Sequence, residues 1–175
     1  GATILMPPGT LTEGDGISDT FQLSFYEKHV TIECDVTTGA CVWKGATGKR
    51  VVHIRNSAGT TTLSQIIIRN GDGYMGGGLL AKNSVVLLDR VSFIENHAGA
   101  GGAVYVEQGA STVTMQGCTF SGNTASSTGP DVQVENGQTA SVTGCPEGER
   151  ANMSRGGQER KWRECRRARV LHFWG

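Results

Sequence analysis

The sequence predicts an all-β chain wound into a single-stranded parallel β-helix, a solenoid of about five or six turns. Similar segments recur along the chain and end in Asn70, Asn96 and Asn123, so the closing asparagines are 26 and then 27 residues apart. Between them lie short runs of Val, Ile, Leu, Thr and Phe separated by glycine, asparagine or serine, without the spacing of a helix. A period of this size, built from short strands and glycine turns, is typical of a solenoid.

The composition agrees with this fold class. The chain has 175 residues, of which 26 are glycine, and its formal net charge is zero. Abundant glycine favours β structure with many tight turns. No run of 18 apolar residues is present, so no transmembrane helix is expected. Because the sequence begins at Gly1 without a signal peptide, we expect a mature or excised fragment.

The first turn is expected to begin with an apolar strand in residues 2–11. This strand is interrupted by Pro7-Pro8-Gly9, which suits a sheet edge because proline cannot donate to a central ladder. Alternating residues in 21–25 and 29–34 predict two more strands. Further strands are expected over residues 51–56, 60–63, 131–136 and 139–145.

The cysteines leave two interpretations open. Cys34 and Cys41 flank a turn-rich hexapeptide and are placed to close it by a disulfide, the alternative being two free buried thiols. Cys118 and Cys145 are 27 residues apart, one period, so we expect them to stack in adjacent turns. This mixture of cysteine uses favours an oxidising compartment.

The period also predicts which side chains stack. Asn70, Asn96 and Asn123 are expected at one corner, because asparagine tolerates the left-handed conformation of a sharp corner and its amide can bond to the next in a ladder. Three unrelated turn asparagines are the alternative. Phe93 and Phe120 are expected to superimpose as a core stack.

Two adjacent elements, Phe93-Ile94-Glu95-Asn96 and Gly101-Gly102-Ala103-Val104, resemble the repeat of polymorphic outer membrane proteins. Residues 120–123 give a second copy of the first element, whereas 67–70 has isoleucine in place of phenylalanine and 76–79 lacks the alanine. Those proteins belong with the pectin-lyase-like right-handed parallel β-helices, and parallel crossovers prefer the same hand. The resemblance implies a secreted or surface solenoid used for adhesion or glycan contact, and it implies no catalytic residues.

The chain divides in charge. Residues 1–145 contain 8 Lys and Arg against 12 Asp and Glu, whereas residues 146–175 contain 8 against 4. We therefore expect a β-helix domain over 1–145 and a poorly structured, basic, Arg/Trp-rich extension over 146–175. Capping of the solenoid end and binding to an acidic membrane surface or nucleic acid are open roles for the extension, although nucleic acid is not the expected partner.

Few residues are candidates for catalysis or metal binding. The four histidines show no metal-ligand spacing, so neither a metal nor a cofactor is expected. Asp89, Arg90 and Glu95 are the catalytic candidates, because glycosidic cleavage uses paired carboxyls with a nearby cation. A solvated polar face explains the same three residues.

Two function classes follow. The favoured one is a non-enzymatic extracellular or cell-surface β-helix module for adhesion or contact with a polysaccharide or cell-surface glycan. The alternative is a fragment of a carbohydrate-active β-helix enzyme, namely a polysaccharide lyase, glycoside hydrolase or epimerase acting on an acidic polysaccharide. A flat face of Thr, Ser and Asn favours the module, and a cleft lined by two carboxylates favours the enzyme.

Overall fold

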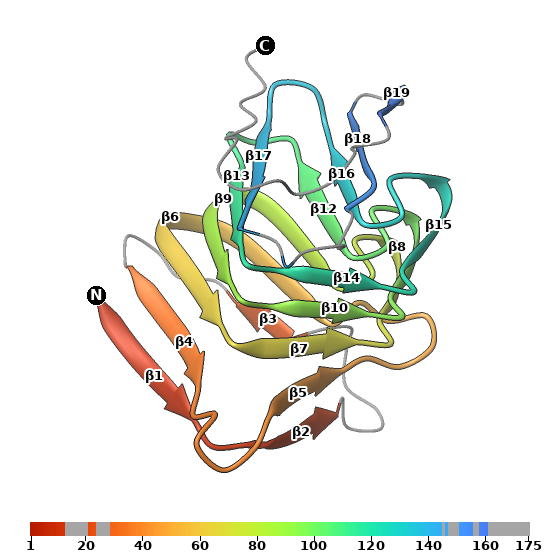
Figure 1. Ribbon diagram of the computed structural model, residues 1–175. Helices are drawn as coiled ribbons and strands as arrows, with labels where there is room; N and C mark the ends of the chain where they lie inside the picture. The colour runs from red at the N-terminus through yellow and green to blue at the C-terminus, as the bar shows by residue number, and fades with distance from the viewer. Residues whose placement is uncertain (13–20, 24–28, 145, 147–150, 156–157, 161–175) are drawn as a thin grey trace.

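The computed structural model describes residues 1–12, 21–23, 29–144, 146, 151–155 and 158–160, and all regular secondary structure in these ranges is β-strand (Figure 1). Strands one circuit apart in the sequence pair in parallel, and the turns stack from the N-terminal to the C-terminal end (Figure 1). One side of the coil holds a sheet of five strands, which corresponds to about five turns. The predicted parallel β-helix is therefore confirmed.

The largest sheet covers two sides of the coil, because β6 (Val52–Ser64) and β9 (Leu79–Asp89) are long enough to contribute to both. We call the side formed by their first halves face A and the side formed by their second halves face B. Face A also contains β3 (Phe21–Leu23), β12 (Val104–Glu107), β16 (Val132–Val134), β18 (Met153–Arg155) and, antiparallel to β18, β19 (Gln158–Arg160). Face B also contains β1 (Ala2–Met6), β4 (Val30–Cys34), β13 (Thr112–Gln116) and β17 (Thr139–Thr143).

Face C closes the coil. It contains β2 (Gly9–Thr12), β5 (Cys41–Lys44), β7 (Ile66–Arg69), β10 (Ser92–Ile94) and β14 (Thr119–Ser121). These five strands carry the repeated segments from which the solenoid is predicted.

Three further strands form narrow arms between face C and face A: β8 (Asp72–Met75), β11 (His97–Ala100) and β15 (Thr124–Thr128). The first arm leaves the coil at Gly71 and returns to it at Gly77. The two glycines are in such close contact that a Cβ at Gly71 would overlap the carbonyl oxygen of Gly77. The register between β11 and β15 shifts after Ala98, where β15 accommodates an extra residue. The arms therefore stack in parallel as a separate three-stranded sheet, with one irregularity between the second and the third.

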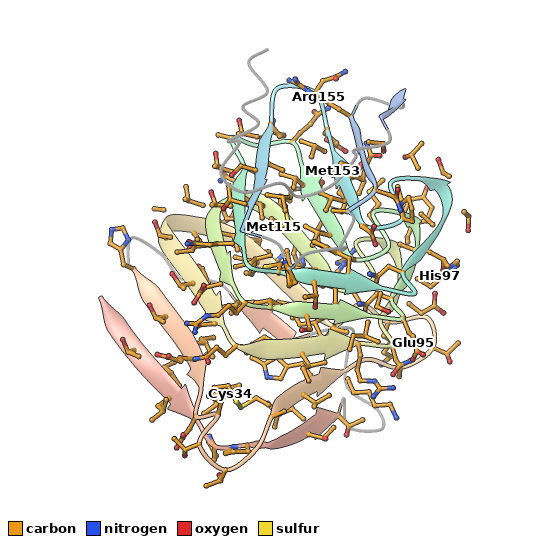
Figure 2. The ribbon with its side chains drawn as sticks, viewed as in Figure 1. Cys34, Glu95, His97, Met115, Met153 and Arg155 are labelled. Atoms are coloured by element: carbon orange, nitrogen blue, oxygen red, sulfur yellow. A yellow bond between two sulfur atoms is a disulfide. The ribbon has the colours of Figure 1, made fainter. Side chains whose placement is uncertain are left out.

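Columns of equivalent side chains fill the interior. One column on face C contains Trp43, Ile68, Phe93 and Phe120 in successive turns. The rings of Phe93 and Phe120 are stacked, with centroids 5.5 Å apart and planes 7° from parallel. Face B adds Met115, which points into the same interior (Figure 2). Each such side chain contributes about 2 to 3 kcal/mol on burial, which explains why stacked turns are stable where a single turn is not.

The bends between faces use left-handed backbone, which few residue types adopt readily. Arg90, with φ 51°, forms a bend between faces B and C, and Glu95, with φ 53°, forms the bend between face C and the second arm. Asn70, with φ 55°, forms the equivalent bend one turn before Glu95. Two of these left-handed positions are thus occupied by long charged residues.

The prediction that Asn70 stacks with Asn96 and Asn123 is wrong. Ile68 pairs with Phe93, so Asn70 lies beside Glu95, and Gly71 lies beside Asn96. The reason is the alternation of β7: Ile66 and Ile68 both point into the core, and this parity sets the register of the bend that follows.

At the N-terminal end, a disulfide joins Cys34 to Cys41, the pair that the sequence singles out, with 5.7 Å between their Cα atoms. At the other end β18 pairs in parallel with β16, so part of the stretch 146–175 belongs to the coil. Cys145 and residues 161–175, which include most of the basic extension, lie outside the described residues.

Candidate functional site

Asp89 and Arg90 lie together where face B meets face C. Asp89 Oδ2 accepts hydrogen bonds from Arg90 Nε (3.1 Å) and Nη2 (2.8 Å), and from Ser64 Oγ (3.1 Å). Hydrogen bonding to Asp89, followed by its charge, raises the pKa of Arg90 above its usual value. The pair forms a compact ion pair at a bend.

Glu95 directly follows β10, whereas Asp89 and Arg90 precede that strand. It lies at the outer margin of the coil near His97 (Figure 2). Glu95 Oε2 accepts from Arg69 Nη2 (3.4 Å) and Asn70 Nδ2 (3.2 Å), and its side chain is 58% exposed. Because five residues of extended chain span roughly 16 Å, the bends at Arg90 and Glu95 are far apart compared with the about 5 to 9.5 Å between the two carboxyls of a glycosidase. The structure does not bring Asp89 and Glu95 together as a carboxylate pair.

Asn96 and Asn123 form a buried ladder at the bend beside face C. Asn96 Nδ2 donates to Asn123 Oδ1 (3.1 Å) and to Ile68 O (3.0 Å), and Asn96 Oδ1 accepts from Gly71 N (3.0 Å). Asn123 Nδ2 in turn donates to Phe93 O (3.1 Å). These amides satisfy backbone groups that the bend leaves without strand partners, so the ladder is structural.

The outward surface of face B is rich in small hydroxyl side chains, and we call it the hydroxyl face. The strands that form it pair in consistent register, which puts their outward residues in straight columns about 4.8 Å apart from strand to strand. One column contains Thr3, Thr31, Thr62, Leu87, Thr114 and Ser141, and its neighbour contains Thr60, Val85, Thr112 and Thr139.

The hydroxyl face combines partial exposure with few internal bonds. Thr62, Thr112, Thr114 and Ser141 are partly exposed. Ser141 Oγ donates to Thr114 Oγ1 at 3.4 Å, a long contact that leaves both hydroxyls able to bond elsewhere. The chemistry available on this face is hydrogen bonding combined with methyl contact.

The outward surface of face A is chemically different. His53 and Arg55 on β6 lie beside Leu80 and Lys82 on β9, which lie beside Tyr105 and Glu107 on β12. Lys82 Nζ contacts Glu107 Oε1 at 2.6 Å, and Tyr105 donates its hydroxyl to Glu135 Oε1 at 2.6 Å. We call His53, Arg55, Lys82 and Glu107, together with Arg50 just before β6, the polar cluster.

Burial shifts several pKa values on face A. It lowers the pKa of His53 to about 4, and the neighbouring charges of Arg50 and Arg55 lower it further in the same direction. Burial also lowers the pKa of Arg50, whose guanidinium donates to the carbonyl oxygens of Met75 and Gly76. Burial, followed by the bond to Glu135, raises the pKa of Tyr105. His53 is therefore neutral at pH 7, and the nearby carboxylate of Glu107 only partly offsets the effect of the cations on its pKa.

The sequence interpretation did not single out the polar cluster. Its members are spread from residue 50 to residue 107 and become neighbours only when the turns are placed in register. The period of the repeats could have revealed these neighbours, because His53 and Leu80 are 27 residues apart and Leu80 and Tyr105 are 25 apart.

Comparison with known protein families finds a match to one short repeat. Residues 90–107 match the Chlamydia polymorphic membrane protein (Chlamydia_PMP) repeat. No curated protein and no solved structure gives a significant match. In the part of the chain that the structure describes, no helix is long and apolar enough to cross a membrane, and no three His, Cys, Asp or Glu residues are grouped to hold a metal.

The matched segment covers the bend at Arg90, strand β10, Asn96 of the ladder, the second arm and strand β12. It thus contains both elements that resemble the polymorphic membrane protein repeat, and each has a structural role: Phe93 stacks in the core and the Gly101-Gly102-Ala103 segment returns the arm to the coil. The chain is a parallel β-helix that carries a polymorphic membrane protein repeat, which indicates a surface-exposed β-helix protein.

Proposed function

We propose that the chain is a non-enzymatic, extracellular or cell-surface β-helix module that contacts a glycan through the hydroxyl face and so supports adhesion. The observation that carries this proposal is the in-register arrangement of threonine and serine side chains on face B. Small side chains lose little rotamer entropy when a ligand immobilises them, so a flat array can bind an extended polymer by many weak hydrogen bonds.

The separation of the carboxylates favours the module over an enzyme. Asp89 is engaged by Arg90 and Ser64, and Glu95 lies at the far end of β10. Neither acid therefore has the partner that glycosidic cleavage needs. Consequently Asp89→Asn should leave any turnover of a sugar polymer unchanged.

The test is binding to a glycan array, followed by titration of the best ligand with a face variant. Thr62→Ala, Thr114→Ala and Ser141→Ala together remove three outward hydroxyls without adding bulk. At about 0.5 to 1.5 kcal/mol for each of the three hydrogen bonds, we expect affinity to fall by roughly tenfold to a thousandfold.

The matched control is Ser121→Ala, Ser126→Ala and Ser127→Ala, which removes three exposed hydroxyls from β14 and the third arm. The control should bind like the unaltered protein. Equal losses in both variants would contradict the role of the hydroxyl face. Formation of unsaturated product from a polyuronate, lost a hundredfold in Asp89→Asn, would instead support the enzyme.

A further inference from the structure

Tyr74 in the first arm is the most exposed of the large apolar side chains among the residues that the structure describes. It is 82% exposed, whereas the other exposed members of this group lie between 40% and 62%. Tyrosine is enriched at binding surfaces, because its ring contributes apolar contact and its hydroxyl contributes a hydrogen bond. The surroundings of Tyr74 therefore define a candidate binding surface outside the three faces of the coil.

The strand next to Tyr74 provides a flat floor for the ring. β8 and β11 pair in parallel with Ala98 beside Gly73 and Ala100 beside Met75, so Gly99 lies beside Tyr74. A Cβ at Gly99 would lie 2.7 Å from the carbonyl oxygen of Tyr74 and 3.8 Å from ring atom Cδ2. Only glycine fits at this position, because the carbonyl oxygen leaves no room for a side chain. One edge of the ring is thus next to Gly99, while most of the ring remains open to solvent.

Two polar side chains lie on the same side of the arm sheet as Tyr74 and are already oriented. Asp72 precedes Tyr74 by two residues and His97 lies beside Asp72, so strand alternation puts all three side chains on one side. Asp72 Oδ2 accepts from Gly48 N (2.9 Å), and His97 Nδ1 is hydrogen-bonded to Thr124 Oγ1 (2.8 Å). Each group is held through one polar atom, which leaves the second carboxylate oxygen and His97 Nε2 to bond to a ligand.

The size of this surface fits a single sugar ring. Asp72 is about 6.6 Å from Tyr74 along the strand, and His97 lies on the diagonal at roughly 8 Å. The arm sheet has strands of four or five residues, so it covers on the order of 130 Å², far less than the roughly 800 Å² that each partner of a stable protein complex buries. A ligand with apolar C–H groups on its face and hydroxyls on its rim matches an aromatic ring flanked by hydrogen-bonding groups.

We propose that the arm sheet binds one neutral hexopyranose unit of a glycan, with a C–H face of the sugar stacked on the ring of Tyr74 and its hydroxyls bonded to Asp72 and His97. We call these three residues the stacking site. A sugar hydroxyl donates to the free oxygen of Asp72, and a second hydroxyl bonds to His97 Nε2. The stacking site rests on the proposed function, since both need a glycan partner. It is separate from the hydroxyl face, because the arms form a sheet of their own.

The experiment follows the NMR signals of the full chain during titration with cellotriose, laminaritriose, mannotriose and sorbitol, which has the hydroxyls of a sugar but no ring. We expect at least one trisaccharide to shift the ring signals of Tyr74, and its own C–H protons to move upfield because of the ring current. Sorbitol at the same concentration should do neither. The proposal is overturned if no trisaccharide shifts these signals, or if sorbitol shifts them equally. Self-association of the chain that depends on Tyr74, without a response to sugar, would also overturn it and assign the surface to a second copy.

Substitutions at Tyr74 test the location, since its ring is exposed and its replacement leaves the core intact. Tyr74→Ala removes the stacking surface, and we expect affinity to fall about tenfold or more. Tyr74→Phe keeps the ring and should remain within about threefold of the unaltered protein. Val36→Ala is the matched control, because it removes another exposed apolar side chain, in the loop between the bridged Cys34 and Cys41, and it should change affinity less than twofold. Equal losses in Tyr74→Ala and Val36→Ala overturn the site.

The two glycan-binding surfaces are tested separately. The alanine variant of the hydroxyl face should retain the shift of the Tyr74 signals, and Tyr74→Ala should retain the contribution of the hydroxyl face on the glycan array. Loss of array binding in the hydroxyl-face variant, without any response at Tyr74, would support the proposed function and overturn the stacking site. A response at Tyr74 that the hydroxyl-face variant leaves unchanged would support the stacking site even if the role of the hydroxyl face fails.

Discussion

Asn96 Nδ2 lies 3.1 Å from Asn123 Oδ1, and the two amides, both buried, link one turn of the coil to the next. The same Asn96 amide also holds Ile68 O and Gly71 N of the preceding turn. A single side chain thus connects three successive turns, so its loss should be felt in all three.

Asn96→Ala should destabilise the protein by about 3 kcal/mol, because it leaves buried backbone groups without partners. Urea unfolding measures the loss. Asn136→Ala is the control: this asparagine is exposed in a turn and should change stability by less than about 0.5 kcal/mol. Comparable effects of the two substitutions would show that the ladder has no special role.

Phe93→Ala should cost about 3 to 5 kcal/mol, because it opens a cavity between Ile68 and Phe120 in the core column. Phe93→Leu retains much of the volume and should cost clearly less. Val85→Ala, at a position 40% exposed on face B, is the control and should cost about 1 kcal/mol or less. The prediction fails if Phe93→Ala and Val85→Ala unfold at the same urea concentration.

Ala110→Gly should stabilise the protein by about 1 kcal/mol. Ala110 has φ 57° and is exposed, so glycine relieves a left-handed backbone without removing a buried contact. Ala125→Gly in β15 is the opposite case, since its backbone is not left-handed, and it should destabilise by about 0.5 to 1 kcal/mol. A shift of the melting temperature in the same direction for both variants would contradict this account.

Stability should fall as pH drops from about 6.5 to about 4, in part through His53. The pKa of His53 lies near 4 in the folded protein, below its usual value, so the unfolded chain binds the additional proton within this window. The stabilisation is complete above the unfolded pKa and is lost as pH falls towards the folded one. Because His53 is only partly buried, its contribution should be about 1 kcal/mol.

Urea unfolding at pH 7 and pH 4.5 checks this, with His53→Gln expected to reduce the difference between the two values. An NMR titration of the ring gives the pKa directly. A His53 ring that titrates near pH 6.5 would contradict the buried environment described for it.

Much of the fold can be predicted from the sequence, because parallel stacking of turns produces a regular spacing of similar residues along the chain. Phe93 and Phe120 are 27 residues apart and pair in register, and strand alternation identifies which neighbours point inward. The spacing of the asparagines misplaces Asn70, because Asn70 and Asn96 are 26 residues apart whereas the paired residues Ile68 and Phe93 are 25 apart. The inward isoleucines of β7 set this register. A one-residue difference of this kind is visible only after the core face of each strand is known.

The outward surfaces were harder to derive than the core. The hydroxyl face could be anticipated as alternating polar residues. The polar cluster needed the register of three strands, and the bonds from Arg50 to the carbonyl oxygens of Met75 and Gly76 depend on where the first arm returns. The period of the sequence predicts which residues are neighbours within a column. Contacts between columns can be identified only from the three-dimensional structure.

The extra residue taken up in β15 has an evolutionary consequence. The third arm takes up one extra residue while Phe93 and Phe120 remain in contact. Descendants of this chain are therefore free to diversify the projecting segments, or to duplicate whole circuits, without redesigning the packing beneath them. Such an arrangement lets the outline of the arms change faster than the architecture that supports them.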